Sequence, residues 1–197
     1  MSLRIIEGSK GSGKTAVGTA LAETAYNNGQ DIFSNIELGF DFTYIDKEMF
    51  TTKEGRAQLQ NCFVLVDEAH NSFPSYRCMS DEAIAMSFFC KQIRKRYVDV
   101  VLTTQQATAV YIDLRRNLDV LDECTAKKIV STDGRKGMRD ATLYEIEHKK
   151  VDAIVIKETL LWTETSTKPA VVKWRVLPPK ELKRIFTLYN SDEYVEF

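Results

Sequence analysis

The chain has 197 residues, the length of one ordinary domain with a substantial hydrophobic core. Apolar residues make up 44% of it and charged residues 28%, as in globular proteins. Its formal charge of −1 excludes the strong positive field of a histone-like nucleic-acid binder. Any contact with nucleic acid must therefore be local.

The sequence shows neither a membrane span nor a secretion signal. No apolar run approaches the roughly 20 residues that cross a bilayer, and the N-terminus lacks the apolar stretch of a signal peptide. The widely spaced cysteines form no Cys-x-x-Cys pair for zinc or redox chemistry; they are Cys62, Cys78, Cys90 and Cys124. Free thiols and a cytoplasmic location are expected.

The N-terminal half alternates the apolar patterns of strands with those of helices. Strands are predicted at 3–7, 31–36, 42–45, 62–67 and 98–104, and helices over 14–28, 53–60 and 80–94. The run at 62–67 is continuously apolar, as in a strand buried on both faces. This alternation predicts an α/β fold built on a parallel, doubly wound sheet.

Beyond about residue 117 the pattern changes to one of period 2. Segments 141–149 and 170–176 alternate like antiparallel strands with one solvated face. Between them and the first half, 131–140 is expected to be a turn-rich, basic hairpin tip. The prolines at 178–179 precede a short amphipathic helix.

A glycine-rich loop follows the first predicted strand. Residues 8–15 read Gly-Ser-Lys-Gly-Ser-Gly-Lys-Thr and fit the motif G-x-x-x-x-G-K-[ST], here called the P-loop. Its backbone N–H groups and the following helix N-terminus attract phosphate, and glycine lets the backbone approach without a Cβ. Lys14 is expected to contact the β- and γ-phosphates and Thr15 to ligate Mg²⁺. The expected nucleotide-binding residues are Gly8, Ser9, Lys10, Gly11, Ser12, Gly13, Lys14, Thr15 and Ala16. The alternative is a glycine-rich turn that matches by chance.

Two carboxylates, Asp67 and Glu68, follow the buried strand. Asp67 would hold Mg²⁺ through water, and Glu68 could polarise a water against the γ-phosphate. The alternative is a solvated strand end, although charge is costly beside a buried strand unless it is paired. A nucleoside kinase needs no water-activating carboxylate here, whereas an NTPase does. Glu68 therefore favours hydrolysis without excluding transfer.

The strand predicted at 98–104 leads into the polar run Thr-Thr-Gln-Gln at 103–106. If this strand lies beside the one that ends at Asp67, Gln105 comes near the γ-phosphate. An amide there can hydrogen-bond both the attacking water and the phosphate. Taken alone, the run is more often an ordinary polar loop.

Basic residues gather at 91–97, the end of a predicted helix. Arg94 or Arg96 could serve as an arginine finger for the nucleotide of a neighbouring subunit, and Arg115 and Arg116 are rivals. The alternative is a solvated helix C-terminus, where the helix dipole favours cations.

Taken together, these elements resemble the FtsK/HerA branch of RecA-like P-loop ATPases. The closer likeness is to Zot-like proteins and to the small genome-packaging ATPases of membrane-containing archaeal and bacterial viruses. The segments that carry the resemblance are 8–15, 33–38, 64–77, 88–106, 112–119 and 187–197. It implies a RecA-like P-loop NTPase, mainly a parallel sheet flanked by helices, with antiparallel β-hairpin additions in the C-terminal half. One domain over 1–197 is expected, with a core to about 130 and a β-rich extension over 131–197.

The resemblance also implies cofactors and roles. ATP and Mg²⁺ would be bound, with Thr15 and Asp67 at the metal, Glu68 as the base and Gln105 as a polar sensor. Arg94 sits where FtsK-type pumps carry an arginine ahead of the sensor strand. Family members form rings, commonly hexamers, that move double-stranded DNA through a central pore.

Two departures narrow the expected function. Filamentous-phage Zot proteins continue into a membrane-spanning segment and FtsK carries a DNA-reading domain, and this sequence shows neither. We therefore expect an ATP-driven translocase that packages a viral genome, in the host cytoplasm or on the virion. A capsid vertex or a membrane protein is the candidate partner. A nucleoside or nucleotide kinase and a Zot-type, nucleotide-gated assembly protein are the alternatives.

With a net charge of −1, the grip on DNA should be concentrated in one place. The expected contacts are Arg135, Lys136 and Arg139 in the hairpin tip at 133–140, which would hold phosphates without reading sequence. The alternative is an ordinary solvated turn.

Overall fold

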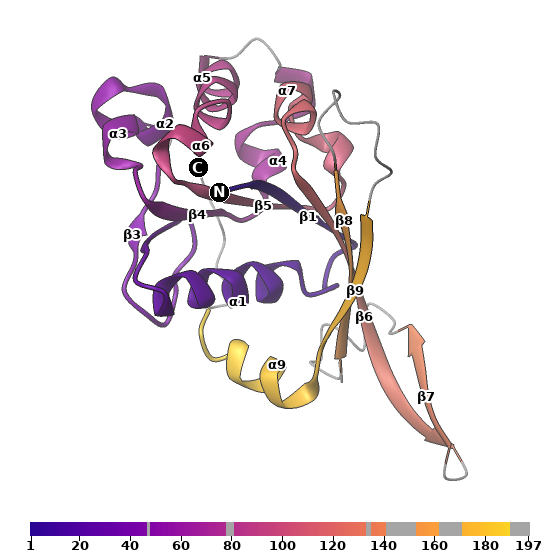
Figure 1. Ribbon diagram of the computed structural model, residues 1–197. Coiled ribbons are helices and arrows are strands. Elements are labelled where there is room, and N and C mark those ends of the chain that lie inside the picture. The colour runs from indigo at the N-terminus through magenta and orange to yellow at the C-terminus, as the bar shows by residue number, and fades with distance from the viewer. Residues whose placement is uncertain (47, 78–80, 133–134, 141–152, 162–170, 190–197) are drawn as a thin grey trace.

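The computed structural model describes residues 1–46, 48–77, 81–132, 135–140, 153–161 and 171–189. Figure 1 shows a twisted sheet with helices on both faces. The strands are β1 Leu3–Glu7, β2 Asp31–Ser34, β3 Thr43–Tyr44, β4 Cys62–Val66, β5 Asp99–Thr104, β6 Val120–Thr132, β7 Arg135–Asp140, β8 Ala153–Leu160 and β9 Val171–Leu177. The helices are α1 Lys14–Asn27, α2 Glu48–Thr51, α3 Lys53–Gln58, α4 Ala69–Ser72, α5 Asp81–Cys90, α6 Ile93–Arg96, α7 Ile112–Arg116 and α9 Pro179–Ile185, with 3₁₀ turns η1 Ser75–Arg77 and η2 Ala107–Ala109.

The described strands form one sheet in the order β3-β2-β4-β5-β1-β6-β8-β9, and β7 pairs with β6 off this path. The strands from β3 to β6 in this order are parallel, and β7, β8 and β9 are antiparallel additions. The chain passes from β1 to β2 on one side of β1 in the sheet, whereas it passes from the neighbouring β5 to β6 on the other side. Ligands of such sheets bind at the carboxyl ends of the strands where the winding diverges in this way.

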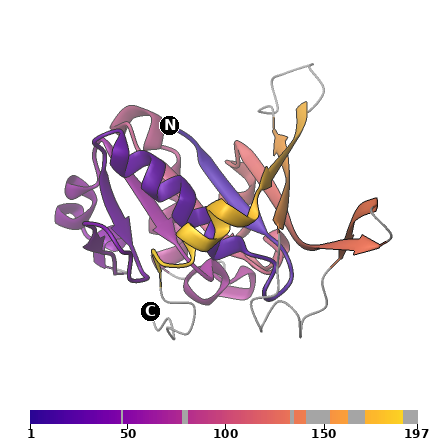
Figure 2. The ribbon, with the colours of Figure 1, turned by 90° about the horizontal axis from the view of Figure 1, so that it is seen from below.

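Helices cover the two faces unequally. α1 and α9 lie on one face, side by side in Figure 2, and the helices from α2 to α7 lie on the other. The α2–α7 face has a core in which Phe50 meets Phe73 and Phe89 edge to face. On the α1 face, Leu182 and Ile185 of α9 are buried in a second core. A sheet buried on both faces explains why β4 is apolar at every position.

Charged side chains tie the antiparallel strands to β1. Arg4 Nη1 donates to Asp122 Oδ2 at 2.6 Å and to Glu158 Oε2 at 3.0 Å, and Arg175 Nη2 lies 3.3 Å from the same Glu158 oxygen. Burial raises the pKa of the fully buried Asp122, against the opposing charge of Arg4. A buried charge that loses its partner is strongly destabilising. The network therefore fixes β6, β8 and β9 against the strand that precedes the P-loop.

The sequence predicted the α/β class, and the observed sheet confirms it. The predicted helix at 14–28 is α1, and Gly29 follows its C-cap with φ +80°, the left-handed conformation that ends many helices. The predicted strand at 170–176 is β9, and the one at 141–149 falls outside the described residues. β6 crosses residue 130, so the division into core and extension stays a prediction.

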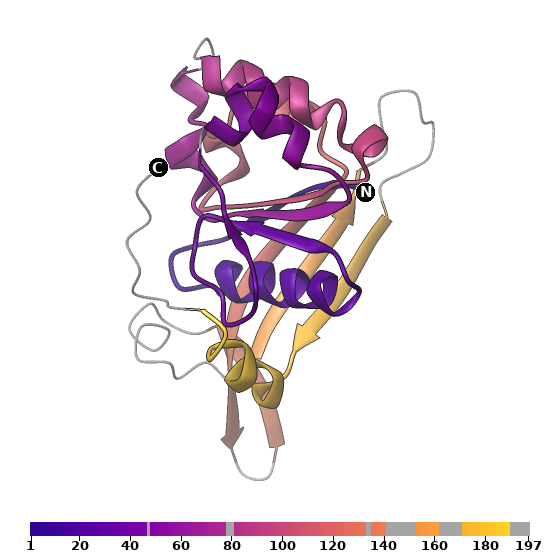
Figure 3. The same cartoon turned by 90° about the vertical axis from the view of Figure 1, so that its left-hand side faces the viewer.

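Three details differ from the sequence analysis. The predicted helix at 80–94 is divided into α5 and α6, because the backbone tightens where Gln92 N donates to Phe89 O. The segment expected as a hairpin tip is mostly strand: β7 begins at Arg135 and pairs with β6 (Figure 3). Strand β8 was not predicted, although it is central among the antiparallel strands. Within the described residues, no helix is long and apolar enough to cross a membrane.

Candidate nucleotide site

The carboxyl ends of β1, β4 and β5 lie next to one another in the sheet. The register pairs Glu7 with Thr104 and brings Asp67, which follows β4, level with Thr103. The P-loop follows β1, the acidic pair follows β4, and Gln105 follows β5. Three motifs that are far apart in the sequence therefore meet at one edge of the sheet.

The P-loop closes tightly over the sheet at two glycines. Gly13 has φ +90° and caps α1, and a Cβ there would come within 2.8 Å of the Ile154 side chain. A Cβ on Gly8 would come within 2.7 Å of the Cys124 carbonyl oxygen. Both positions need the absence of a side chain because of this close packing, a different reason from the approach to phosphate that the sequence analysis gave. The loop tip at Ser9, Lys10 and Gly11 is exposed.

Thr15 and Asp67 face each other across the site. Thr15 Oγ1 donates to the Asp67 carboxylate, at 3.1 and 3.2 Å from its two oxygens. Thr103 Oγ1 donates to Asp67 Oδ1 at 2.5 Å. The buried Asn35 side chain brackets the Asp67 backbone, since its Oδ1 accepts from the Asp67 N–H at 2.7 Å and its Nδ2 donates to the Asp67 carbonyl at 3.0 Å. Asn35 was not singled out from the sequence.

Several features of its environment shift the pKa of Asp67. The side chain is almost completely buried, and this burial raises its pKa. Hydrogen bonds from Thr103 and Thr15 and the Lys14 ammonium act in the opposite direction, while the Glu68 charge adds to the rise. A cation bound here would relieve the buried charge.

The polar groups of the loop fit a phosphate and a hard cation. Ser12 Oγ is buried and has no hydrogen-bond partner among the described residues. Lys14 is 5% exposed and its Nζ donates to the Ser9 carbonyl at 3.2 Å, across the loop. Thr15 and Asp67 offer only oxygen donors, which suit Mg²⁺ because it takes few protein ligands and completes its shell with water and phosphate.

Glu68 adopts an uncommon backbone conformation. Its φ of 49° and ψ of 46° are left-handed, at the N-cap of α4. Such conformations cost about 1–3 kcal/mol in non-glycine residues and cluster at functional sites. The Glu68 N–H donates to Thr103 Oγ1 at 3.0 Å, and its Oε2 lies 3.2 Å from His70 Nδ1. His70 was not singled out from the sequence, because a lone histidine carries no spacing signal.

The expected sensor lies at the end of β5. Gln105 is exposed and directly follows Thr104, whose Oγ1 shares a hydrogen bond with His70 Nδ1 at 3.3 Å. Next to it, Glu7 Oε2 accepts from the Ala107 N–H at 2.7 Å and fastens the loop after β5 to the end of β1.

The finger candidates lie away from this edge. Arg94 and Arg96 belong to α6, before β5, and a six-residue strand of about 17 Å separates them from Gln105. Arg94 is 67% exposed and pairs with Asp119 at 2.7 Å, whereas Arg96 Nη1 donates to the Arg56 carbonyl at 2.6 Å.

The rivals on α7 are also engaged within the chain. Arg115 Nε donates to the Val110 carbonyl at 3.0 Å, and Arg116 lies 3.3 Å from Asp113.

The three expected DNA-binding cations, Arg135, Lys136 and Arg139, belong to β7, opposite residues 132, 131 and 128 of β6.

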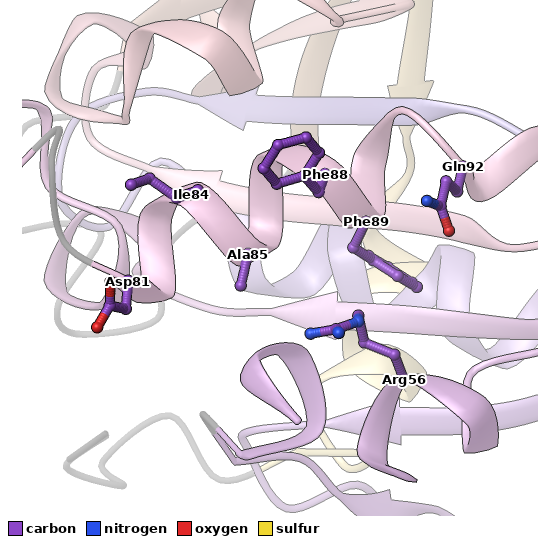
Figure 4. Close-up of a pocket in the computed structure, with 7 residues that line it drawn as sticks. All are labelled: Arg56, Asp81, Ile84, Ala85, Phe88, Phe89 and Gln92. Carbon is purple, nitrogen blue, oxygen red and sulfur yellow. The ribbon is translucent and has the colours of Figure 1, made fainter. Parts of the chain in front are cut away.

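A separate cavity of about 360 Å³ lies on the other face of the sheet, between α3 and α5. Figure 4 shows its lining, from Asp81 at the start of α5 to Phe88, Gln92 and Arg56. The Arg56 guanidinium donates to the carbonyls of Phe50 and Thr51 and so fastens α2. The cavity is not part of the P-loop site.

Comparison with known protein families assigns the chain to one of them. Residues 2–193 match the family described as zonular occludens toxin (Zot). The chain belongs to the Zot family. It is thus a Zot-family P-loop ATPase by sequence, as the resemblance implied.

Solved structures agree with this fold. The Zot-family chain superposes on the N-terminal domain of zonular occludens toxin from Neisseria meningitidis with a TM-score of 0.58 and 18% identity, covering 96% of this chain and 98% of that one. The genome packaging NTPase B204 from Sulfolobus turreted icosahedral virus 2, in complex with ATP-γ-S, gives a TM-score of 0.51 at 9% identity over 87% and 96% of the two chains. Its complex with AMPPCP gives 0.50 at 8% over the same shares. No curated protein sequence matches the chain.

The close packing at Gly13 in this Zot-family chain predicts a stability difference between two glycine substitutions. Gly29→Ala meets nothing within 4 Å and incurs only the left-handed backbone cost of about 1–2 kcal/mol. Gly13→Ala incurs the same cost and also displaces Ile154, for about 1–3 kcal/mol more. Urea unfolding without nucleotide measures both. Adding Ile154→Val to Gly13→Ala should recover part of the loss, and equal losses for the two single variants would contradict the packing argument.

Proposed function

We propose that this Zot-family chain hydrolyses ATP with Mg²⁺ and uses the reaction to move double-stranded DNA during the packaging of a viral genome. The observation that carries the proposal is the meeting of Thr15, Asp67 and Glu68 at the P-loop. A threonine hydroxyl and a buried carboxylate suit a metal beside the phosphates, and a second carboxylate stands next to them for water.

Each residue has a proposed part in the reaction. Lys14 would leave the Ser9 carbonyl and bind the β- and γ-phosphates of ATP, and the unpartnered Ser12 hydroxyl would join them. Thr15 and Asp67 would hold Mg²⁺, which when bound neutralises charge on the phosphate oxygens. Glu68 would accept a proton from the attacking water, and Gln105 would hydrogen-bond the water and the γ-phosphate.

The alternatives differ in what the nucleotide does. The similarity in fold to a viral genome packaging NTPase supports packaging. Membership of the Zot family supports the second candidate, a Zot-type, nucleotide-gated assembly protein without DNA pumping. A kinase is the third, and Glu68 beside the site speaks for water rather than a bound hydroxyl as the acceptor. ATP hydrolysis measured with and without duplex DNA separates all three.

The split between binding and hydrolysis gives the first functional prediction. Lys14→Ala should abolish turnover and weaken ATP binding, because it removes a cation from the phosphates. Glu68→Gln should keep ATP binding and lower kcat by about 10²–10⁴-fold, because the amide is no base. Steady-state hydrolysis and binding of a fluorescent ATP analogue measure the two effects. Lys180→Ala, on the exposed side of α9, is the control. Equal loss of ATP binding in Lys14→Ala and Glu68→Gln would contradict the proposed division of roles between phosphate binding and water activation.

We propose further that the chain acts as one ATPase domain in a homo-oligomeric ring, a hexamer by the family resemblance. Arg94 lies at the opposite end of β5 from the P-loop, so it is badly placed to reach the nucleotide of its own subunit. Its 67% exposure leaves it accessible to a neighbour. The working location would be the host cytoplasm or the virion, with a capsid vertex or a membrane protein as partner.

Mixing two inactive variants tests the role of Arg94 in trans. Lys14→Ala subunits lack the phosphate contact and Arg94→Ala subunits lack the finger, so mixed interfaces contain some complete sites. Mixtures should hydrolyse ATP faster than either variant alone. If no mixture gains activity while Arg94→Ala binds ATP normally, Arg94 is not the finger, and Arg96 is tested next.

The proposed grip on DNA is the β6–β7 hairpin, whose described strands extend beyond the body of the molecule in Figures 1 and 3. Replacing Arg135, Lys136 and Arg139 by alanine should leave DNA-free ATP hydrolysis intact. It should lower the slope of log affinity for duplex DNA against log salt by about 3, because about one counterion is released per phosphate contact. The matched control replaces three exposed cations elsewhere, Lys173, Lys180 and Lys183. An unchanged slope in the first variant would mean that the phosphates are held elsewhere.

A further inference from the structure

His70 stands beside the proposed base and has no part in the mechanism above. It is the second residue of α4, two residues after the left-handed Glu68, and its side chain is one-quarter exposed. Its Nδ1 lies 3.2 Å from Glu68 Oε2 and 3.3 Å from Thr104 Oγ1. The ring therefore stands between the base and the end of β5.

The neighbours of Nδ1 determine which proton it carries. An ionised carboxylate only accepts hydrogen bonds. The Thr104 hydroxyl donates its hydrogen to the Gln106 carbonyl at 3.1 Å, so towards His70 it also accepts. Nδ1 must therefore be the protonated nitrogen that serves both oxygens.

The Glu68 carboxylate has one shielded oxygen. Oε2 is buried and makes no well-aligned hydrogen bond with the described residues, so the His70 contact is the polar support that the described structure offers it. Contacts of catalytic groups are often loosely aligned without substrate and tighten once it binds. The side chain as a whole keeps 31% of its surface exposed, so its remainder reaches solvent.

We propose that His70 is a positioning residue for Glu68: its Nδ1–H holds Oε2 so that the other oxygen faces the attacking water. The inference rests on the proposed role of Glu68 in ATP hydrolysis. The Glu68 backbone is held by Thr103 through its N–H, and the carboxylate is held by His70, which Thr104 supports. Two consecutive residues of β5 thus orient the base at both ends, next to Gln105.

The test uses three substitutions in the full chain. In His70→Asn the side-chain amide can place a donor close to the position of Nδ1, in His70→Gln the amide lies one bond farther out, and His70→Ala removes it. We expect His70→Ala and His70→Gln to lower kcat for ATP by about 10- to 100-fold, the cost of a misplaced catalytic group. His70→Asn should stay within about threefold of the unsubstituted chain. The dissociation constant of an ATP analogue should change less than about twofold in all three.

A double variant shows whether His70 acts through Glu68. Adding His70→Ala to Glu68→Gln should lower kcat no further, because residues that act through one another are not additive. Should His70→Ala fail to fold, the Asn and Gln variants, matched for thermal stability, carry the comparison. Full activity of His70→Ala, or equal rescue by Asn and Gln, would overturn the inference while leaving ATP hydrolysis in place. If the unsubstituted chain hydrolyses no ATP, the proposed function itself fails.

Discussion

A charged carboxylate is stable in a protein interior only where hydrogen-bond donors surround it. The geometry of the candidate site depends on the donors that surround Asp67. Its side chain is 7% exposed, and it accepts hydrogen bonds from Thr15 of α1 and Thr103 of β5. Asn35, just beyond β2, holds its backbone. Three segments besides its own, α1, β5 and the end of β2, must therefore be in place before this buried charge is tolerable.

Strand β5 contributes to both faces of the site through neighbouring residues. Thr103 reaches Asp67 and lies against α1, since a Cβ on Gly18 would meet its methyl group at 3.6 Å. Thr104 reaches His70 of α4 on the opposite face. Successive residues of a strand point to opposite faces, so one short polar run contacts Asp67, the proposed metal ligand, on one side and His70, beside the proposed base, on the other. A small shift of β5 would therefore change the contacts of both Asp67 and His70.

Patterns within a few consecutive residues were enough to predict the P-loop and the elements around it. The P-loop, α1 and the buried run of β4 have strong signals within a few residues, and all three are where they were predicted. The acidic pair was found because charge beside a buried strand is conspicuous. These features also fix the edge of the sheet at which nucleotide would bind.

What was missed depends on contacts between distant residues. β8 mixes apolar and charged positions because Glu158 is buried against Arg4, a pairing that no window of sequence reveals. The basic segment from Arg135 has turn-forming composition, yet it pairs with β6 as a strand. His70 gains its meaning only from Glu68 and Thr104, which come from two different elements. Tertiary pairing decided each of these positions.

Strands β6 and β8 are in direct contact with the P-loop. Gly8 lies against the Cys124 carbonyl of β6, and Gly13 lies against Ile154 of β8. β6 runs on to the hairpin with β7, the proposed grip on DNA. Because protein interiors are close-packed and transmit strain, a change in loop shape when phosphate binds must be taken up by β6 and β8. The proposed grip and the proposed nucleotide site are thus joined through β6, which is one continuous strand over Val120–Thr132.

The same strands return to the site by a second route. β9 leads into α9, which packs on α1, and Leu188 and Tyr189 then join residues 38–39, beyond β2. Burial and the nearby Asp67 charge raise the pKa of Tyr189, so the end of this segment lies within electrostatic reach of Asp67. The C-terminal strands thus meet the nucleotide site at the P-loop and again near Asp67.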